Sequence, residues 1–158
     1  MNTIADRLGV GRSTLYRWIG SREQLLGWVV CASIGEIWEA ARRSAEGAGL
    51  ERMLSSCRIF IDAVGAHSPL VTWAQREPNL ALRVLLDPDG DVTSALRQSM
   101  QRALQREMPN SEVSPEVFQM LALAATALVW GNVAGHRNPD ADSAIGIMRT
   151  VLSAHLTT

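Results

Sequence analysis

The residues best suited to chemistry in this sequence are four arginines spaced along its first 22 positions. Arg7, Arg12, Arg17 and Arg22 stand there against one acidic residue, Asp6, so this segment carries a formal charge of +3. The chain has 15 basic and 16 acidic residues in all, so the remaining eleven arginines and fifteen acidic residues carry −4. Positive charge gathered at one end of a near-neutral chain is suited to neutralising nucleic-acid phosphates, which gives salt-dependent affinity.

The residues around these arginines predict two short helices joined by a tight turn. Three apolar residues with helical spacing define the inward face of the first helix: Ile4, Ala5 and Leu8. Gly9 stands where that helix must end in a left-handed turn, which glycine adopts without steric cost. Gly11 can begin a second helix over residues 12–18, and we expect Leu15 with Trp18 or Ile19 to pack it on the first. Such a pair is typical of a helix-turn-helix that reads the major groove.

The order of these residues resembles the signature of tetracycline-repressor-type (TetR) regulators. The resemblance lies in Ile-Ala at 4–5, Leu-Gly-Val at 8–10, Thr-Leu-Tyr-Arg at 14–17 and Gly-Ser-Arg-Glu-Gln-Leu-Leu at 20–26. The departures are Gly11, Ile19 and Arg22, where the family usually has serine, phenylalanine and lysine.

The resemblance implies a transcriptional repressor whose second helix contacts operator DNA as part of a dimer. It assigns phosphate contacts to the tyrosine of that helix and to the basic residue that begins the next one. We therefore expect bases to be contacted by Arg12, Ser13 and Thr14, and phosphates by Tyr16, Arg17 and Arg22.

Family members normally carry about one further helix before the equivalent of Ile4. A late-annotated start and a truncated head both explain its absence here, and the sequence leaves both open. In a truncated head, Ile4, Leu8 and Trp18 lose a packing partner, and we expect DNA affinity to suffer.

Composition predicts an all-α fold: the 158 residues are 47% hydrophobic and 20% charged, without sustained strand-like alternation. We divide the chain into a helix-turn-helix head at residues 1–26 and a helical effector-binding and dimerisation body at residues 27–158. Ser21 and Gln24 form a predicted capping box for a long helix over residues 21–46, which joins the two parts. Its spacing suggests an inward face made of Leu25, Trp28, Val29, Ala32, Ile37, Trp38 and Ala41.

Beyond the long helix, apolar periodicity and breaks at Gly, Pro and Asp predict helices over residues 50–66, 70–75, 80–86, 92–107, 117–134 and 141–155. Asp91 or Thr93 is the expected cap of the 92–107 helix. Residues 117–134 contain no charged residue, so a membrane span is an alternative. We favour a buried helix at a subunit interface, which pairs with 141–155 and a second copy in a four-helix bundle.

The body segment from Trp73 to Leu85 resembles the branch named for control of a quorum-quenching lactonase (QsdR-like regulators), which implies a small-molecule effector such as an acyl-homoserine lactone or a γ-butyrolactone. Large apolar residues and one arginine are the candidate effector-binding residues: Trp38, Phe60, Trp73, Arg76, Met100, Phe118 and Trp130. His67 and Asn132 are further candidate polar anchors. Ordinary core packing is an equally good explanation for each of them.

The sequence contains no nucleophile-elbow motif, no phosphate-binding glycine loop and no cluster of metal-ligand residues. We therefore expect no enzyme activity, no catalytic residue, no metal and no cofactor. Cys31 and Cys57 have no zinc-site spacing and are expected to be reduced thiols in the cytoplasm. The alternative function is a helical small-molecule-binding or dimerisation protein that has lost DNA binding through truncation.

Overall fold

The computed structural model describes residues 2–156, and in that part of the chain every regular element is an α-helix. The all-α prediction is therefore confirmed. In chain order the helices are α1 (Asn2–Leu8), α2 (Arg12–Ile19), α3 (Arg22–Ser44), α4 (Gly49–Ala66), α5 (Ser68–Arg76), α6 (Pro78–Leu85), α7 (Asp91–Glu107), α8 (Pro115–Ala134) and α9 (Ala141–Leu156). The division between head and body predicted after residue 26 falls inside the continuous helix α3 and remains a prediction.

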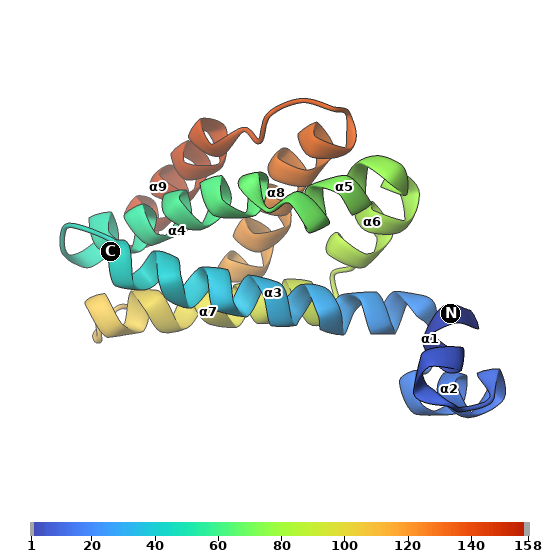
Figure 1. The fold of residues 1–158 in the computed structure, drawn as a ribbon. Helices are drawn as coiled ribbons and strands as arrows, with labels where there is room; N and C mark the ends of the chain where they lie inside the picture. Colours follow the sequence, from blue (N-terminus) through green and yellow to red (C-terminus); the bar gives the residue numbers. More distant parts are fainter. Residues whose placement is uncertain (1, 157–158) are drawn as a thin grey trace.

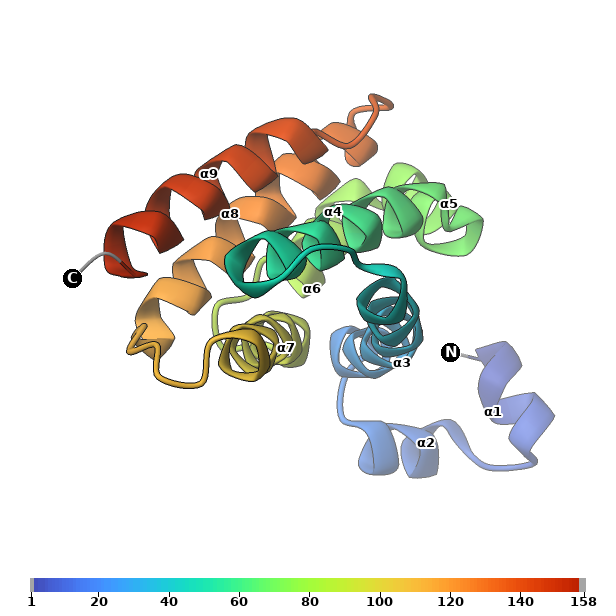
Figure 2. The ribbon, with the colours of Figure 1, turned by 90° about the vertical axis from the view of Figure 1, so that its left-hand side faces the viewer.

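The long helix α3 connects a small head to the rest of the molecule. Figure 1 shows α1 and α2 at one end of α3, while α4 to α9 gather along its remaining length. Helix α7 lies beside α3, and α4 packs on both of them. Figure 2 shows α8 and α9 side by side at the edge of the body.

The inward face of α3 differs from the predicted one. Its buried large residues are Val30, Ile34 and Trp38, whereas Trp28 and Val29 are 47% and 52% exposed. Ala32 is exposed as well. Trp38 and Ala41 are buried as predicted. The prediction was wrong for Trp28, Val29 and Ala32, because apolar residues occur on two sides of this helix and periodicity alone cannot say which side meets α4 and α7.

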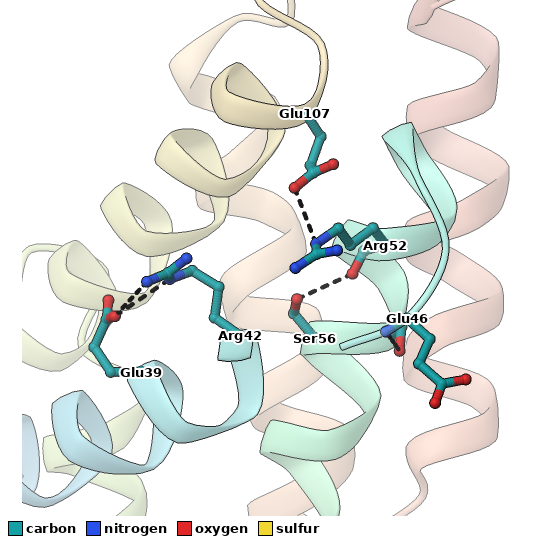
Figure 3. A network of polar contacts seen from close by, with 7 residues as sticks. Glu39, Arg42, Glu46, Arg52, Ser56 and Glu107 are labelled. Carbon is teal, nitrogen blue, oxygen red and sulfur yellow. Dashed lines mark hydrogen bonds and ion pairs between the residues drawn. The ribbon is translucent and has the colours of Figure 1, made fainter. Parts of the chain in front are cut away.

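Polar contacts hold the region around the end of α3 that lies farthest from the head (Figure 3). Arg42 donates to Glu39 one turn earlier, with its Nη2 at 2.9 Å from Oε2. Arg52 of α4 pairs with Glu107 of α7 at 3.2 Å, and the Ser56 hydroxyl donates to the Arg52 carbonyl at 3.0 Å. The Arg52–Glu107 pair joins α4 to α7, whereas the other two contacts lie within α3 and within α4. The far part of α3 is held to the body by the burial of Trp38 and Ala41.

Two of the later helices begin in different ways. Pro115 is the first residue of α8, directly after the N-cap Ser114, and proline is favoured at that position. Gly90, rather than Asp91 or Thr93, is the N-cap of α7, so that prediction was wrong. Thr93 is 1% exposed and its hydroxyl has no hydrogen-bond partner, because its position in the first turn faces the body.

Candidate nucleic-acid interface and effector cavity

Two buried residues set the geometry of the head. Ala5 of α1 and Leu15 of α2 are 1% and 3% exposed, and they are the residues of these two helices that are buried. Gly9 adopts the predicted left-handed conformation with φ of +65°, and the Val10 amide donates to the Ala5 carbonyl at 3.1 Å. The turn therefore brings α2 against α1 as the sequence predicted.

A second glycine fixes the angle between α2 and α3. Gly20 has φ of +69°, and its amide donates to the Tyr16 carbonyl at 2.8 Å. The predicted capping box follows at once: the Gln24 amide donates to the Ser21 hydroxyl at 3.1 Å, and the Ser21 amide donates to the Gln24 side-chain carbonyl at 2.8 Å. A Cβ atom on Gly20 would lie 1.8 Å from Oε1 of Gln24. The junction therefore requires glycine for its backbone conformation, and a Cβ there would also displace the end of the Gln24 side chain that forms the capping box.

The outward face of α2 carries the predicted DNA contacts. Arg12, Ser13, Tyr16 and Arg17 are exposed, and Thr14 is half-buried. Within the described residues, Arg12 and Arg17 form no ion pair, so their guanidinium groups are available to an anionic partner. Helix α2 contains no acidic residue that would oppose a phosphate.

Arg22 differs from the other predicted contacts because it already has an anionic partner. It is the first residue of α3, and its Nη2 lies 2.8 Å from Oε1 of Glu77. Glu77 stands between α5 and α6, in the body of the molecule. Sequence reasoning missed this contact because the two residues are 55 positions apart.

Several large apolar side chains near the head are exposed. Ile4 is 39% exposed, and Leu8 and Trp18 are each 58% exposed. The prediction that Ile4 and Leu8 lie on an inward face is therefore wrong within residues 2–156, where Ala5 alone fills that role for α1. Among the described residues, these three side chains are not buried by a neighbouring helix, in contrast to the apolar residues in the core of the body.

The body contains a partly open cavity of about 40 Å³ between α3, α4, α6, α7, α8 and α9. Four of the seven predicted effector-binding residues line it: Trp38, Phe60, Met100 and Trp130. Trp38 and Phe60 meet edge to face, with ring centroids 5.5 Å apart. The other lining side chains are also uncharged: Ile34, Cys57, Ile61, Val64, Leu85, Val92, Leu96, Ala122, Ala125, Thr126, Val129 and Met148.

The other three predicted effector residues lie elsewhere. Phe118 is 1% exposed and belongs to the packed core. Trp73 of α5 is half-buried, and its indole Nε1 has no hydrogen-bond partner. Arg76 is exposed in a surface recess beside Arg22 and Glu77.

The candidate polar anchors are not at the cavity either. His67 is the N-cap of α5 and its Nδ1 accepts from the Leu70 amide at 3.4 Å, while Asn132 does not line the cavity. Among the lining residues, Thr126 carries a hydroxyl and Cys57 a thiol. Burial raises the pKa of the Cys57 thiol to about 12, so that thiol is neutral at physiological pH.

The described residues contain no group of three or more His, Cys, Asp or Glu side chains arranged to hold a metal ion. One described helix, α8, is long and apolar enough to cross a membrane. Its most apolar window is 44% buried inside the chain, so part of its uncharged surface packs in the core and part faces outward. Met120 is 60% exposed on that outward part.

The comparisons with known proteins point to one class of regulator. Residues 48–153 match the model of the tetracyclin repressor-like C-terminal domain. The fold also resembles the solved structure of the transcriptional repressor QsdR of the TetR family from R. erythropolis, with a TM-score of 0.88 and 25% sequence identity. That similarity covers 96% of this chain and 83% of the other. No curated protein matches the chain.

Proposed function

Since the chain belongs to the tetracyclin repressor-like family of transcriptional regulators, we propose that it is a repressor that binds a near-palindromic operator as a homodimer. The observation that carries this proposal is the outward face of α2, where Tyr16 is exposed and Arg12 and Arg17 have no ion-pair partner among the described residues. The proposed base contacts are Arg12, Ser13 and Thr14, and the proposed phosphate contacts are Tyr16, Arg17 and Arg22. We propose that it acts in the cytoplasm.

The outward surfaces of α8 and α9 support the proposed dimer. On α8, residues with helical spacing form an uncharged, mostly small stripe, namely Met120, Ala124, Ala127 and Gly131. On α9, the exposed residues Ser143, Ile147 and Thr150 form a second uncharged stripe. Small side chains allow helices to approach closely, and a twofold axis would pair both stripes with their copies in a four-helix bundle.

We propose that an effector in the body cavity changes the position of the heads. Helix α3 belongs to both regions, because it begins beside the head and contributes Ile34 and Trp38 to the cavity. A cavity of about 40 Å³ has room for roughly three water molecules, so an effector must push the lining apart. The flexible side chains of Met100 and Met148 are suited to such a change. Moving α3 would alter the spacing of the two recognition helices relative to successive major grooves, about 34–36 Å apart.

A lactone with an alkyl chain fits the chemistry of this cavity, and we propose that class of effector. The described lining contains no charged side chain, so a carboxylate or an ammonium group would be buried there without a partner. A lactone is neutral, and its carbonyl can accept a hydrogen bond from the hydroxyl of Thr126.

One observation favours a second function. Exposure of Ile4, Leu8 and Trp18 leaves α1 and α2 with few buried contacts, as expected of a head that has lost DNA affinity. A body that binds small molecules and dimerises would then be the remaining function.

Binding to the DNA upstream of the chain's own gene distinguishes these functions. Fluorescence anisotropy in low salt should detect binding by the wild-type chain, and Arg12→Gln with Arg17→Gln should abolish it. The matched control is Arg102→Gln with Arg106→Gln, which removes the same charge from exposed positions on α7 and should retain binding. Failure of the wild-type chain to bind DNA would refute the repressor proposal and leave the second function.

A further inference from the structure

Two ion pairs join the first turn of α3 to the region of α6. Arg22 pairs with Glu77 at 2.8 Å, and the next residue along α3, Glu23, pairs with Arg83 at 3.5 Å. The two pairs run in opposite senses: in the first pair α3 supplies the positive charge, and in the second pair it supplies the negative charge. This end of α3 is therefore held to the body by side chains that lie next to the proposed DNA interface.

Glu77 is fixed in place by the bend between α5 and α6. It is the N-cap of α6, its amide donates to the Trp73 carbonyl at 2.9 Å, and its carbonyl accepts from the Ala81 amide at 2.9 Å. Its carboxylate makes no capping hydrogen bond to α6 and instead pairs with Arg22. The position of this negative charge follows the position of α6.

Arg22 cannot offer its full charge to two anions at once. Its side chain is 49% exposed, and the carboxylate of Glu77 already partly neutralises it. Because counterion release depends on how many positive charges meet phosphates, an arginine paired with a carboxylate contributes less to DNA affinity than a free one. This argument rests on the proposed function, in which Arg22 contacts the operator backbone.

We infer that Glu77 competes with an operator phosphate for the guanidinium of Arg22, and so lowers DNA affinity from within the body. Helix α6 also reaches the effector cavity through Leu85, eight positions after Glu77. The competing carboxylate and one wall of the cavity therefore belong to a single short helix. A displacement of that helix therefore changes the distance between the Glu77 carboxylate and the Arg22 guanidinium.

The test is the salt dependence of DNA binding by Glu77→Gln, measured with DNA from upstream of the gene. This change keeps the shape of the side chain and removes its charge, and no cap is lost. We expect affinity in low salt to rise about 1.5- to 5-fold for each protomer that contacts the DNA, the range found for exposed ion pairs. The slope of log affinity against log salt should steepen by up to about 0.9 per protomer, or about 1.8 for the dimer, because each protomer neutralises one more phosphate.

Two control variants separate competition from a general charge effect. Asp142→Asn removes one negative charge from an exposed ion pair with Arg58, on the α4–α9 side of the body, and should change binding much less. In an Arg22→Gln background, Glu77→Gln should have no further effect on either affinity or slope.

Each other outcome overturns the inference. The inference is wrong if Glu77→Gln binds DNA with wild-type affinity and slope, or if it binds more weakly. It is also wrong if the gain in affinity is no larger than that of Asp142→Asn, because Glu77 would then not compete with phosphate for Arg22. These results leave the proposed function intact, since the wild-type chain still binds. If no variant binds DNA, the proposed function and this inference both fail.

Discussion

Replacing Gly20 with alanine should uncouple the head from the body without unfolding the body. The backbone at this position has φ of +69° and ψ of −103°, a region that residues with a Cβ enter at a cost of about 1–3 kcal/mol. The new Cβ would also lie 1.8 Å from Oε1 of Gln24, so the hydrogen bond from the Ser21 amide must break or shift. Losing that bond costs about 0.5–1.5 kcal/mol.

Together these terms amount to about 1.5–4.5 kcal/mol per protomer. The head has little buried surface with which to resist, because Ala5 and Leu15 are its buried residues in α1 and α2. We therefore expect α2 to lose its orientation, and DNA affinity to fall by at least roughly tenfold per protomer, since 1.4 kcal/mol is a factor of ten.

Fluorescence anisotropy measures the affinity, and circular dichroism measures unfolding of the body. The matched control is Gly35→Ala in α3, where a Cβ would meet no atom within 4 Å. That variant should bind DNA like wild type and should gain roughly 0.8–1 kcal/mol in helix propensity. Wild-type DNA affinity for Gly20→Ala would refute the argument that this junction positions α2.

Three further predictions concern the body. Thr126→Val keeps the shape of the cavity and removes its hydroxyl, so the affinity for γ-decalactone, followed by tryptophan fluorescence, should fall roughly fivefold to tenfold; the hydroxycarboxylate from hydrolysis of the same lactone should not bind, and equal binding of both would contradict a neutral site. Ala127→Arg on the outward stripe of α8 should convert the dimer to a monomer in light scattering, whereas Ala40→Arg on the exposed side of α3 should not. Burial raises the pKa of Cys57 to about 12, so roughly one thiol in 10,000 is ionised at pH 8, and iodoacetamide should label Cys31 first in the native protein; equal labelling of both cysteines would show that Cys57 is not buried.

Local signals in the sequence were sufficient to predict the turn and the capping box of the head. Gly9 and the pair Ser21 and Gln24 act on backbone groups within four positions, so their effects are readable from spacing alone. Leu15 was correctly placed inside for the same reason. Ile4 and Leu8 were placed wrongly because a helix of seven residues can bury an apolar face only where another element covers it.

The contacts between distant helices could not be predicted in this way. The pairing of Arg22 with Glu77 depends on where α6 lies across α3, and neither residue type nor spacing encodes that crossing. The same holds for the cavity: Trp38 and Trp130 line it, while Phe118 is packed in the core and Trp73 lies outside its lining. Apolar character predicted burial for these side chains, but their neighbours are set by the packing of whole helices.

A hydroxyl-radical footprint of the chain on DNA from upstream of its gene tests the central proposal most directly. Two copies of α2 in successive major grooves predict two protected stretches on one face of the duplex, with their centres about 10 base pairs apart. The protection should disappear with Arg12→Gln and Arg17→Gln. A single protected stretch, or protection that survives the loss of both arginines, would contradict a dimer that reads DNA through this helix.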